Sequence, residues 1–263
     1  MSSDASAPEL LVDSDDTVLS LRFSNPSRAN ALTPSMLDAL VNALERRAPK
    51  ARVVLLGGAG ERHFSAGLDL SEATPEDLSQ TVLDGERLLG RAAGAIEDCP
   101  RPVVAVVNGS AFGGALELAM ACDWRVASPE AKLGMPAARI GVVYAADGLR
   151  RFVRELGPSR TRRLFLTGRP LSGREALEIG LVDQLAADGD AWEAAGAAGA
   201  DVAGAAPLAV AGTRASVRAL TEGSREEGPR VAERWRARAC GSEAFREGLA
   251  ACRDKRAPDC RER

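Results

Sequence analysis

The feature that most constrains the fold is a short apolar segment that leads into a glycine loop and then into an apolar helix. Val103–Val107 contains only Val and Ala, which is typical of a strand buried on both faces of a sheet. Residues 108–114 carry three glycines, and 115–121 are apolar apart from Glu117. A second buried strand is predicted at 53–56, also followed by a glycine-bearing loop. This pattern predicts an α/β fold with helices packed outside a sheet.

Strand and helix signals alternate along most of the chain. Further strands are expected at 17–23, 124–127 and 181–183. Helices are expected from Thr33 to before Pro49, from Thr74 to Cys99, over 148–156 and 159–166, and from the capping box Ser172–Glu175 to Gly180. After about residue 190 the strand signals cease, so we expect a core over 1–195 and a helical region over 196–263.

Composition excludes several classes of function. The formal net charge is −3, from 34 basic and 37 acidic residues, so no overall field favours nucleic acid or an anionic membrane. His63 is the only histidine and the five cysteines form no Cys-x-x-Cys pair, so neither a metal site nor a disulfide framework is expected. With no export signal or membrane span recognised, we expect a cytoplasmic protein.

Two glycine-bearing loops, 63–70 and 108–114, are candidates for binding an anion. Peptide N–H groups at the start of a helix lack intrahelical acceptors, and the helix dipole adds to their attraction for negative charge. Glycine lets a ligand oxygen approach the backbone closely. Two such donors aimed at one oxyanion would each lower a barrier by on the order of 3 kcal/mol.

Glu117 lies three residues beyond Gly114, on the same helical face, so its carboxylate can reach a ligand bound at the helix start. Its neighbours are apolar, and burial would raise the pKa of this carboxyl toward the range useful for proton transfer. The alternative is a carboxylate that is hydrogen-bonded locally for structural reasons.

Four ordered motifs resemble the enoyl-CoA hydratase/isomerase, or crotonase, superfamily. They are FSAGLDL (64–70), NGSAFGGALELAMACDWRVAS (108–128), LTGRPLSGREALEIGLVD (166–183) and FREGLAACRDKRAP (245–258). The resemblance implies a spiral of ββα units, a C-terminal helical region used in trimer formation, and a homotrimer or dimer of trimers. It also implies an acyl-CoA substrate, with no cofactor beyond the coenzyme A moiety.

The resemblance assigns roles to individual positions. It places the two oxyanion donors on the backbone N–H groups of Leu68 and Gly114. It places coenzyme A contacts at Ser27, Arg28, Ala29, Ala66, Asp69, Phe245 and Lys255. Arg28 and Lys255 would screen phosphates, although both also fit ordinary solvated surface, and Asp69 fits a residue that braces its loop.

The chain departs from the hydratases at one catalytic position. Hydratases use two glutamates to activate water; Glu117 matches the first, and Ala137 stands where the second is expected. The following stretch resembles the methylmalonyl-CoA decarboxylase branch, in which a tyrosine matching Tyr144 lies in the active site. That branch has a histidine where this chain has Leu68. Asp147, in the same loop as Tyr144, is a second candidate for the missing acid.

We therefore expect an acyl-CoA enzyme of the enoyl-CoA hydratase/isomerase family, with Glu117 as acid and base. A malonyl-type decarboxylase that uses Tyr144 is the second possibility. A third is a non-catalytic relative that binds acyl-CoA or RNA, although the C-terminal basic residues alternate with acidic ones and form a poor phosphate-tracking surface.

Overall fold

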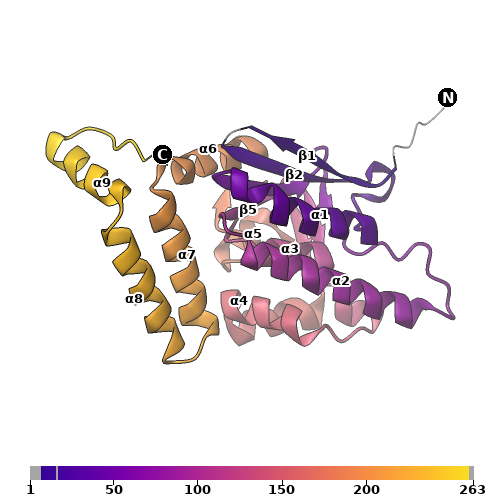
Figure 1. Cartoon of the computed structure of the whole chain (residues 1–263). Coiled ribbons are helices and arrows are strands. Elements are labelled where there is room, and N and C mark those ends of the chain that lie inside the picture. The colour runs from indigo at the N-terminus through magenta and orange to yellow at the C-terminus, as the bar shows by residue number, and fades with distance from the viewer. Residues whose placement is uncertain (1–6, 16, 261–263) are drawn as a thin grey trace.

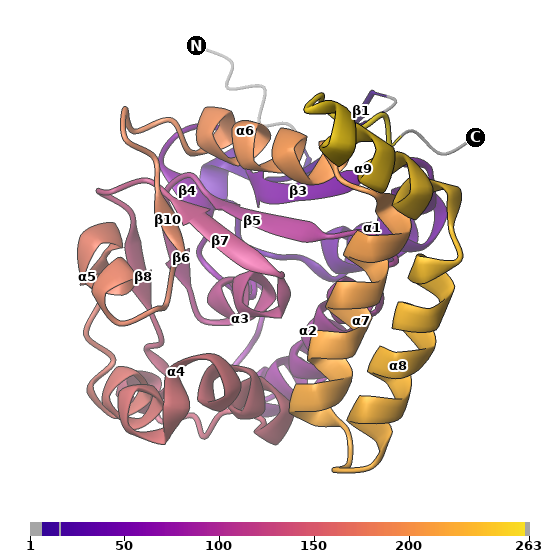
Figure 2. The same ribbon diagram turned by 90° about the vertical axis from the view of Figure 1, so that its left-hand side faces the viewer.

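The computed structural model describes residues 7–15 and 17–260, which form two β-sheets with helices around them (Figures 1 and 2). The larger sheet has six strands in the order β1-β2-β3-β5-β7-β10. These strands are β1 (Glu9–Ser14), β2 (Val18–Ser24), β3 (Val53–Gly58), β5 (Val103–Val107), β7 (Trp124–Ala127) and β10 (Gln184–Leu185). β1 pairs antiparallel with β2, and every other pairing in this sheet is parallel.

The smaller sheet has four strands in the order β4-β6-β8-β9. They are β4 (His63–Ser65), β6 (Ser110–Phe112), β8 (Lys132–Gly134) and β9 (Leu171–Ser172). Three times in succession the chain adds one strand to the larger sheet, the next strand to the smaller sheet, and then a helix. This repetition confirms the predicted α/β fold of ββα units.

The helices of the described residues mostly cover these sheets. The first six are α1 (Pro34–Arg46), α2 (Leu78–Asp98), α3 (Gly114–Ala121), α4 (Ala146–Thr167), α5 (Gly173–Glu178) and α6 (Ala191–Gly204). The last three are α7 (Pro207–Glu222), α8 (Glu227–Cys240) and α9 (Glu243–Asp254). Short 3-10 helices occupy Pro26–Arg28, Ala48–Lys50 and Ala137–Ile140.

The hydrophobic core surrounds α3. Every residue of this helix is buried, and it contacts α2, α4, β6 and β7 (Figure 2). The opposite side of the larger sheet is covered by α6, whose Ala191 and Ala195 pack with residues such as Val53 and Val104. Placing a glutamate on α3 therefore places a carboxylate in the protein interior.

Three boundaries differ from the prediction. α2 begins at Leu78 rather than Thr74, because the side chain of Asp77 accepts a hydrogen bond from the Thr74 N–H and holds 74–77 in a turn. Residues 181–183 were expected to form a strand, but the N–H groups of residues 181 and 182 donate to Ala176 O at the end of α5, and β10 begins at Gln184. The two helices expected between 148 and 166 are joined in α4, across a break at Gly157 (φ 74°, ψ 167°).

The C-terminal helices α7 and α8 form a hairpin beside the core, and α9 extends beyond it (Figure 1). The expected border between 195 and 196 falls inside α6, and the division of the chain into a core and a helical region stays a prediction. Among the described residues no single helix is long and apolar enough to span a membrane. The pair α6 and α7 has the length and composition for it only when taken together, and the two helices are bent by 108°.

Candidate functional site

Each of the two predicted loops contains a strand of the smaller sheet, β4 within 63–70 and β6 within 108–114. β4 and β6 pair in parallel, with His63 opposite Ser110, so the chain leaves both strands at the same edge. Gly67 turns the first loop with a φ of +96°, a region that favours glycine. A Cβ added to Gly67 would lie 2.8 Å from Phe112 O and 3.4 Å from the Gly114 nitrogen. The two loops are therefore in direct contact.

The N–H groups of Leu68 and Gly114 are both without an internal hydrogen-bond acceptor among the described residues. Leu32 N–H donates to Gly67 O at 2.7 Å and Asp69 N–H donates to Leu32 O at 3.0 Å, which uses the peptide groups on either side of Leu68. Gly114 is the first residue of α3, where an N–H has no intrahelical acceptor. Within residues 7–15 and 17–260, neither N–H has a hydrogen-bond acceptor.

Buried asparagine side chains hold the turns that precede these loops. Asn108 donates to Gly58 O at 3.1 Å and accepts from the Gly58 N–H at 3.0 Å. Asn30 donates to Ala59 O at 3.0 Å and to His63 O at 2.9 Å. Since these amides satisfy backbone groups that would otherwise be unpaired in the interior, they fix the path of the chain around the site.

Glu117 lies in the interior with only 3% of its surface exposed, and both of its carboxylate oxygens accept hydrogen bonds. The Tyr144 hydroxyl donates to Oε2 at 2.6 Å, and Arg151 Nη1 donates to Oε1 at 3.0 Å. The Tyr144 ring packs edge-on against Phe165, with ring centroids 5.4 Å apart. A Cβ on Gly148 would lie 2.4 Å from Tyr144 Cε1 and 3.0 Å from Glu117 Oε2, so glycine is needed for this close approach.

The groups around Glu117 have opposite effects on the pKa of its carboxyl group. Burial raises the pKa of Glu117, and the Tyr144 hydrogen bond and the Arg151 charge counteract part of that rise. Burial, with the nearby Glu117 charge, raises the pKa of Tyr144 well above its ordinary value. Tyr144 therefore keeps its proton and serves as the donor in this pair.

Arg151 is the site residue that sequence reasoning missed. It follows Arg150 directly on α4, yet the Arg151 side chain is 9% exposed and the Arg150 side chain is 75% exposed. No local pattern distinguishes the two arginines, because only the packing of α4 against α3 decides which one faces Glu117.

The other two candidate acid positions lie in different surroundings. Ala137 begins a 3-10 helix and is buried, and its methyl group cannot transfer a proton. The Asp147 side chain is 74% exposed and pairs with Arg150 at 3.2 Å on the surface. The structure therefore brings Tyr144, and not Asp147, to Glu117.

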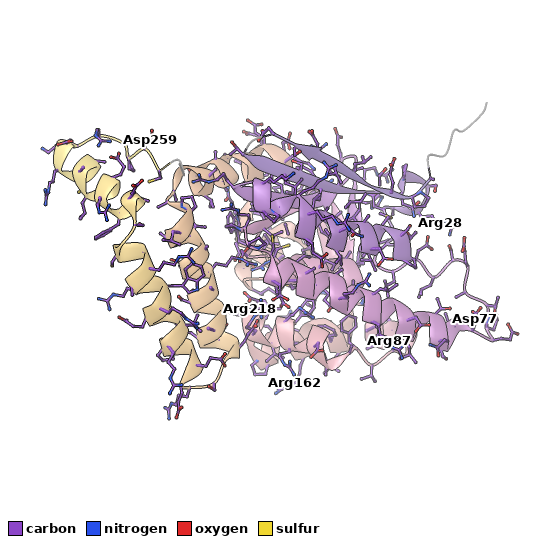
Figure 3. The ribbon with its side chains drawn as sticks, viewed as in Figure 1. Arg28, Asp77, Arg87, Arg162, Arg218 and Asp259 are labelled. Atoms are coloured by element: carbon purple, nitrogen blue, oxygen red, sulfur yellow. The ribbon has the colours of Figure 1, made fainter. Side chains whose placement is uncertain are left out.

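The predicted coenzyme A contacts form two separate groups. Ala66 N–H donates to Ala29 O at 3.0 Å, and Arg28 Nη1 lies 3.8 Å from Asp69 Oδ1, so the stretches 27–29 and 66–69 adjoin. Ser27, Arg28 and Ala66 lie at the surface there. Phe245 belongs to α9 and Lys255 caps it, and α9 lies at the opposite end of the molecule from Arg28 (Figures 1 and 3). One chain does not bring the two groups together.

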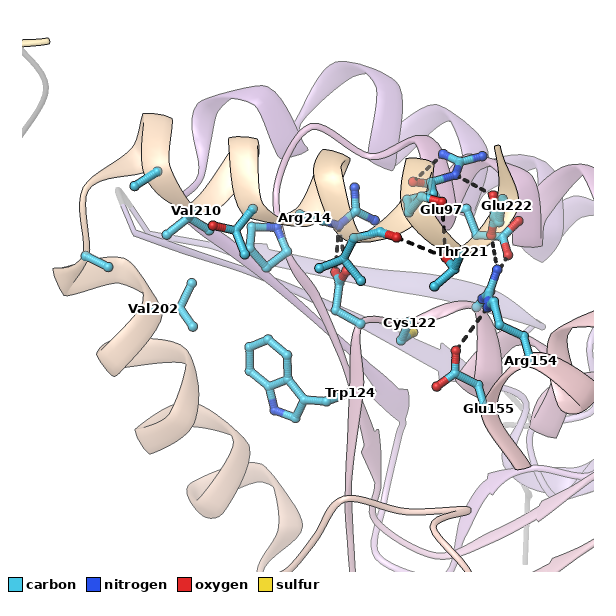
Figure 4. A pocket seen from close by; sticks show the side chains of 18 of the residues that line it. Glu97, Cys122, Trp124, Arg154, Glu155, Val202, Val210, Arg214, Thr221 and Glu222 are labelled. Carbon is cyan, nitrogen blue, oxygen red and sulfur yellow. Dashed lines mark hydrogen bonds and ion pairs between the residues drawn. The ribbon is translucent and has the colours of Figure 1, made fainter. Parts of the chain in front are cut away.

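A cavity of about 800 Å³ lies between α7 and the core (Figure 4). Its apolar wall includes Cys122, Trp124 and Val210, and Glu97 and Glu222 lie at its charged end. Neither Leu68, Gly114 nor Glu117 lines it. No group of three His, Cys, Asp or Glu side chains among the described residues could hold a metal ion.

Known proteins are similar to this chain in both sequence and fold. The enoyl-CoA hydratase/isomerase family model matches residues 13–263. Carnitinyl-CoA dehydratase of Proteus mirabilis (strain HI4320) is 35% identical over 217 residues, covering 80% of this chain and 82% of that protein. The 2,3-dehydroadipyl-CoA hydratase of Escherichia coli (strain K12) is 32% identical over 254 residues, covering 95% and 98%.

A solved structure of enoyl-CoA hydratase from Bacillus anthracis superposes with a TM-score of 0.88 at 30% identity, covering 96% of this chain and 99% of that one. These similarities extend over nearly the whole chain and agree with the resemblance carried by the four motifs. The chain belongs to the enoyl-CoA hydratase/isomerase family.

Proposed function

We propose that this protein acts on acyl-CoA thioesters and stabilises a thioester enolate between the N–H groups of Leu68 and Gly114. Both N–H groups lack an internal acceptor among the described residues, and they come from loops that touch. Relatives named as a carnitinyl-CoA dehydratase and a 2,3-dehydroadipyl-CoA hydratase support a coenzyme A thioester as the substrate class.

Negative charge that develops on the thioester oxygen would be held by preorganised dipoles. Each donor would contribute on the order of 3 kcal/mol to lowering the barrier, because the dipoles require no reorganisation during the reaction. The Gly114 N–H adds the positive end of the α3 dipole, which further favours an oxyanion at this place.

Glu117 is proposed to move the proton. In double-bond isomerisation its carboxylate removes a proton from C2 of a 3-enoyl-CoA. The C–H electron pair forms a C1=C2 bond as the carbonyl π pair moves onto the thioester oxygen, which gives a dienolate. The dienolate collapses as the same carboxyl group returns the proton to C4, which leaves the 2-enoyl-CoA and restores the carboxylate. The two existing hydrogen bonds leave further lone pairs on Glu117 for this transfer.

The observation that carries this choice is that Ala137 stands where the hydratases have their second catalytic glutamate. Addition of water across a double bond requires one group to activate the water and another to supply a proton to carbon, and hydratases divide this work between two glutamates. Ala137 cannot perform either step. Isomerisation needs one group that moves one proton, and Glu117 is sufficient for it.

Decarboxylation of a malonyl-type thioester is a second candidate, and the Tyr144–Glu117 hydrogen bond of 2.6 Å favours it. The bond between C2 and the carboxylate carbon would break, carbon dioxide would leave, and the electron pair would pass to the thioester oxygen held by the two N–H groups. Tyr144 would protonate C2 and recover a proton from solvent. No cofactor beyond the coenzyme A moiety is needed for either reaction.

A homotrimer or a dimer of trimers is proposed to complete the coenzyme A site. Within one chain α9 lies far from Arg28, so the contacts of Phe245 and Lys255 would come from another copy (Figure 3). The C-terminal helices also leave large apolar side chains exposed. These are Val217, Leu220, Phe245 and Leu249, with exposed fractions of 44 to 58%. Such residues are suited to an interface between copies.

Three substrates separate the reactions. The purified protein would be incubated with a 3-enoyl-CoA, with crotonyl-CoA and with methylmalonyl-CoA. We expect conversion of the first to the 2-enoyl-CoA without formation of a 3-hydroxyacyl-CoA from the second. Rapid hydration of crotonyl-CoA would contradict the single-carboxylate mechanism, and carbon dioxide release from methylmalonyl-CoA alone would establish the decarboxylase.

A further inference from the structure

Arg151 links Glu117 to a second carboxylate, that of Glu97, which is largely buried. Its Nε and Nη2 donate to Glu97 Oε1 and Oε2 at 3.0 and 2.8 Å, and its Nη1 donates to Glu117 Oε1 at 3.0 Å. The side chains of Glu97, Arg151 and Glu117 are 12%, 9% and 5% exposed. The two parallel bonds to Glu97 fix the plane of the guanidinium, since a planar fork matches a carboxylate at two points.

Glu97, which anchors Arg151, also pairs with a second arginine nearer the surface. Arg154 Nη2 lies 3.5 Å from Glu97 Oε1, and Arg154 also pairs with Glu222 on α7. Two arginines therefore face Glu97. Because Arg154 also neutralises part of the Glu97 charge, the positive charge of Arg151 still acts on Glu117. Glu97 and Glu222 lie at the charged end of the cavity beside α7, and Arg154 pairs with both (Figure 4).

We propose that Arg151, anchored by Glu97, is a positioning residue that fixes the orientation of the Glu117 carboxylate. This inference rests on the proposed role of Glu117 as acid and base. Arg151 holds Oε1 while Tyr144 holds Oε2, so the carboxylate is restrained at both ends. A carboxylate restrained in this way delivers its proton along one direction, which is the condition for efficient transfer between two carbons.

The charged and polar groups that act on Glu117 come from two helices and one loop. Arg151 on α4 and the Tyr144 hydroxyl stabilise the charged form, whereas Glu97 and Glu86 on α2 oppose it. Neutralising Arg151 therefore moves the titration of Glu117 to higher pH. Neutralising Glu97 moves it to lower pH, provided that the amide introduced by Glu97→Gln still accepts one hydrogen bond from Arg151. The two substitutions therefore shift the pKa of Glu117 in opposite directions.

The test compares Arg151→Gln, Arg151→Lys and Glu97→Gln in the full-length protein. Titration of Glu117 is followed by infrared difference spectroscopy, with Glu117→Gln identifying its carboxylate band, and kcat and KM are measured across pH with a 3-enoyl-CoA. We expect Arg151→Gln to lower kcat roughly 10²-fold with little change in KM, because a misplaced carboxylate affects the transition state. Arg151→Lys should restore the wild-type titration but not kcat, since an ammonium supplies the charge without the two-point fork.

Arg125→Lys is the matched control for loss of a buried arginine. Arg125 is 2% exposed and pairs with Asp183 at 2.7 Å, so Arg125→Lys should lower the thermal midpoint without moving the Glu117 titration. An unshifted titration in Arg151→Gln, or the same direction of shift in Arg151→Gln and Glu97→Gln, would overturn the proposal. If the wild type consumes no thioester, the proposed function fails, while the infrared titration still decides the role of Arg151.

Discussion

Tyr144 and Glu117 lie 27 positions apart in the chain and are joined by a hydrogen bond of 2.6 Å from the phenol to Oε2. The phenol comes from the segment just before α4 and the carboxylate comes from the first turn of α3. The bond therefore ties the start of one helix to the interior face of another. It also places a second proton-bearing group beside the only carboxylate that the proposed mechanism uses.

Replacing Glu117 by Gln should strongly slow the chemical step and leave the fold intact. Gln has the same shape and can still accept from Arg151, but it cannot take up a proton. We expect kcat for a 3-enoyl-CoA to fall roughly 10²- to 10⁴-fold. Glu155→Gln is a suitable control, because Glu155 is also an ion-paired carboxylate but contacts Arg125 and Arg154. Full turnover by Glu117→Gln would remove this carboxylate from the mechanism.

Replacing Tyr144 by Phe should change the pH profile of isomerisation. The Tyr144 hydrogen bond lowers the pKa of Glu117, so its loss lets that pKa rise further. The base form of Glu117 is present above its pKa, and activity falls as pH drops through that value. The acidic limb of kcat should therefore move to higher pH, with most activity recovered in more alkaline buffer.

The same variant separates the two candidate reactions. If Tyr144 protonates C2 after decarboxylation, Tyr144→Phe should slow formation of propionyl-CoA from methylmalonyl-CoA at every pH. Recovery at alkaline pH is expected only where the phenol acts through Glu117. A pH profile identical to that of the wild type would show that the phenol neither transfers a proton nor affects Glu117.

The fold could be predicted from local patterns because its strands and helices carry strong signals. The apolar strand Val103–Val107 and the glycine loop after it specified both the sheet and the start of α3. The short strands of the smaller sheet were not predicted. β4, β6, β8 and β9 contain two or three residues each, too few for a period of two to be recognised. Their pairing depends on contacts between distant segments.

The candidate site could likewise be predicted only in part from the sequence. Glu117 and Gly114 lie on one helix, so their spacing alone placed them together. The meeting of Gly67 with Gly114 depends on the parallel pairing of β4 and β6, and only the motifs linked those positions beforehand. The contact of Arg151 with Glu117 depends on helix packing, which no local pattern records.

Mixing two impaired variants should test whether α9 contributes to the site of another copy. Lys255→Gln combined with Phe245→Ala should raise KM for acyl-CoA, while Glu117→Gln should lower kcat. If the α9 contacts come from a neighbouring copy, co-refolded mixtures contain sites with an intact Glu117 and a neighbour's intact α9. Such mixtures should regain activity at low substrate concentration. Activity that never exceeds the sum of the separate variants would assign Phe245 and Lys255 to their own chain or to no site.

Replacing Gly67 by Ala should lower activity more than the same substitution at a glycine with a similar backbone conformation elsewhere in the chain. Gly67 has a φ of +96°, and an added Cβ would lie 2.8 Å from Phe112 O, which precedes the Gly113–Gly114 turn. The loop that carries the Leu68 N–H would have to move away from Gly114, so one oxyanion donor would be misplaced. We expect kcat to fall roughly 10²- to 10³-fold, as for loss of one such donor.

Gly60 provides the control for backbone strain alone. Its φ is +74°, and an added Cβ would meet no atom within 4 Å. Gly60→Ala should cost about 1 to 3 kcal/mol of stability from the left-handed backbone and leave turnover unchanged. If Gly67→Ala retains wild-type kcat while its thermal midpoint falls as in Gly60→Ala, the Leu68 N–H does not hold the oxyanion. A loss of kcat confined to Gly67→Ala, with KM preserved, would show that contact between the two loops is needed for the chemical step, because strain of the same kind at Gly60 leaves that step unaffected.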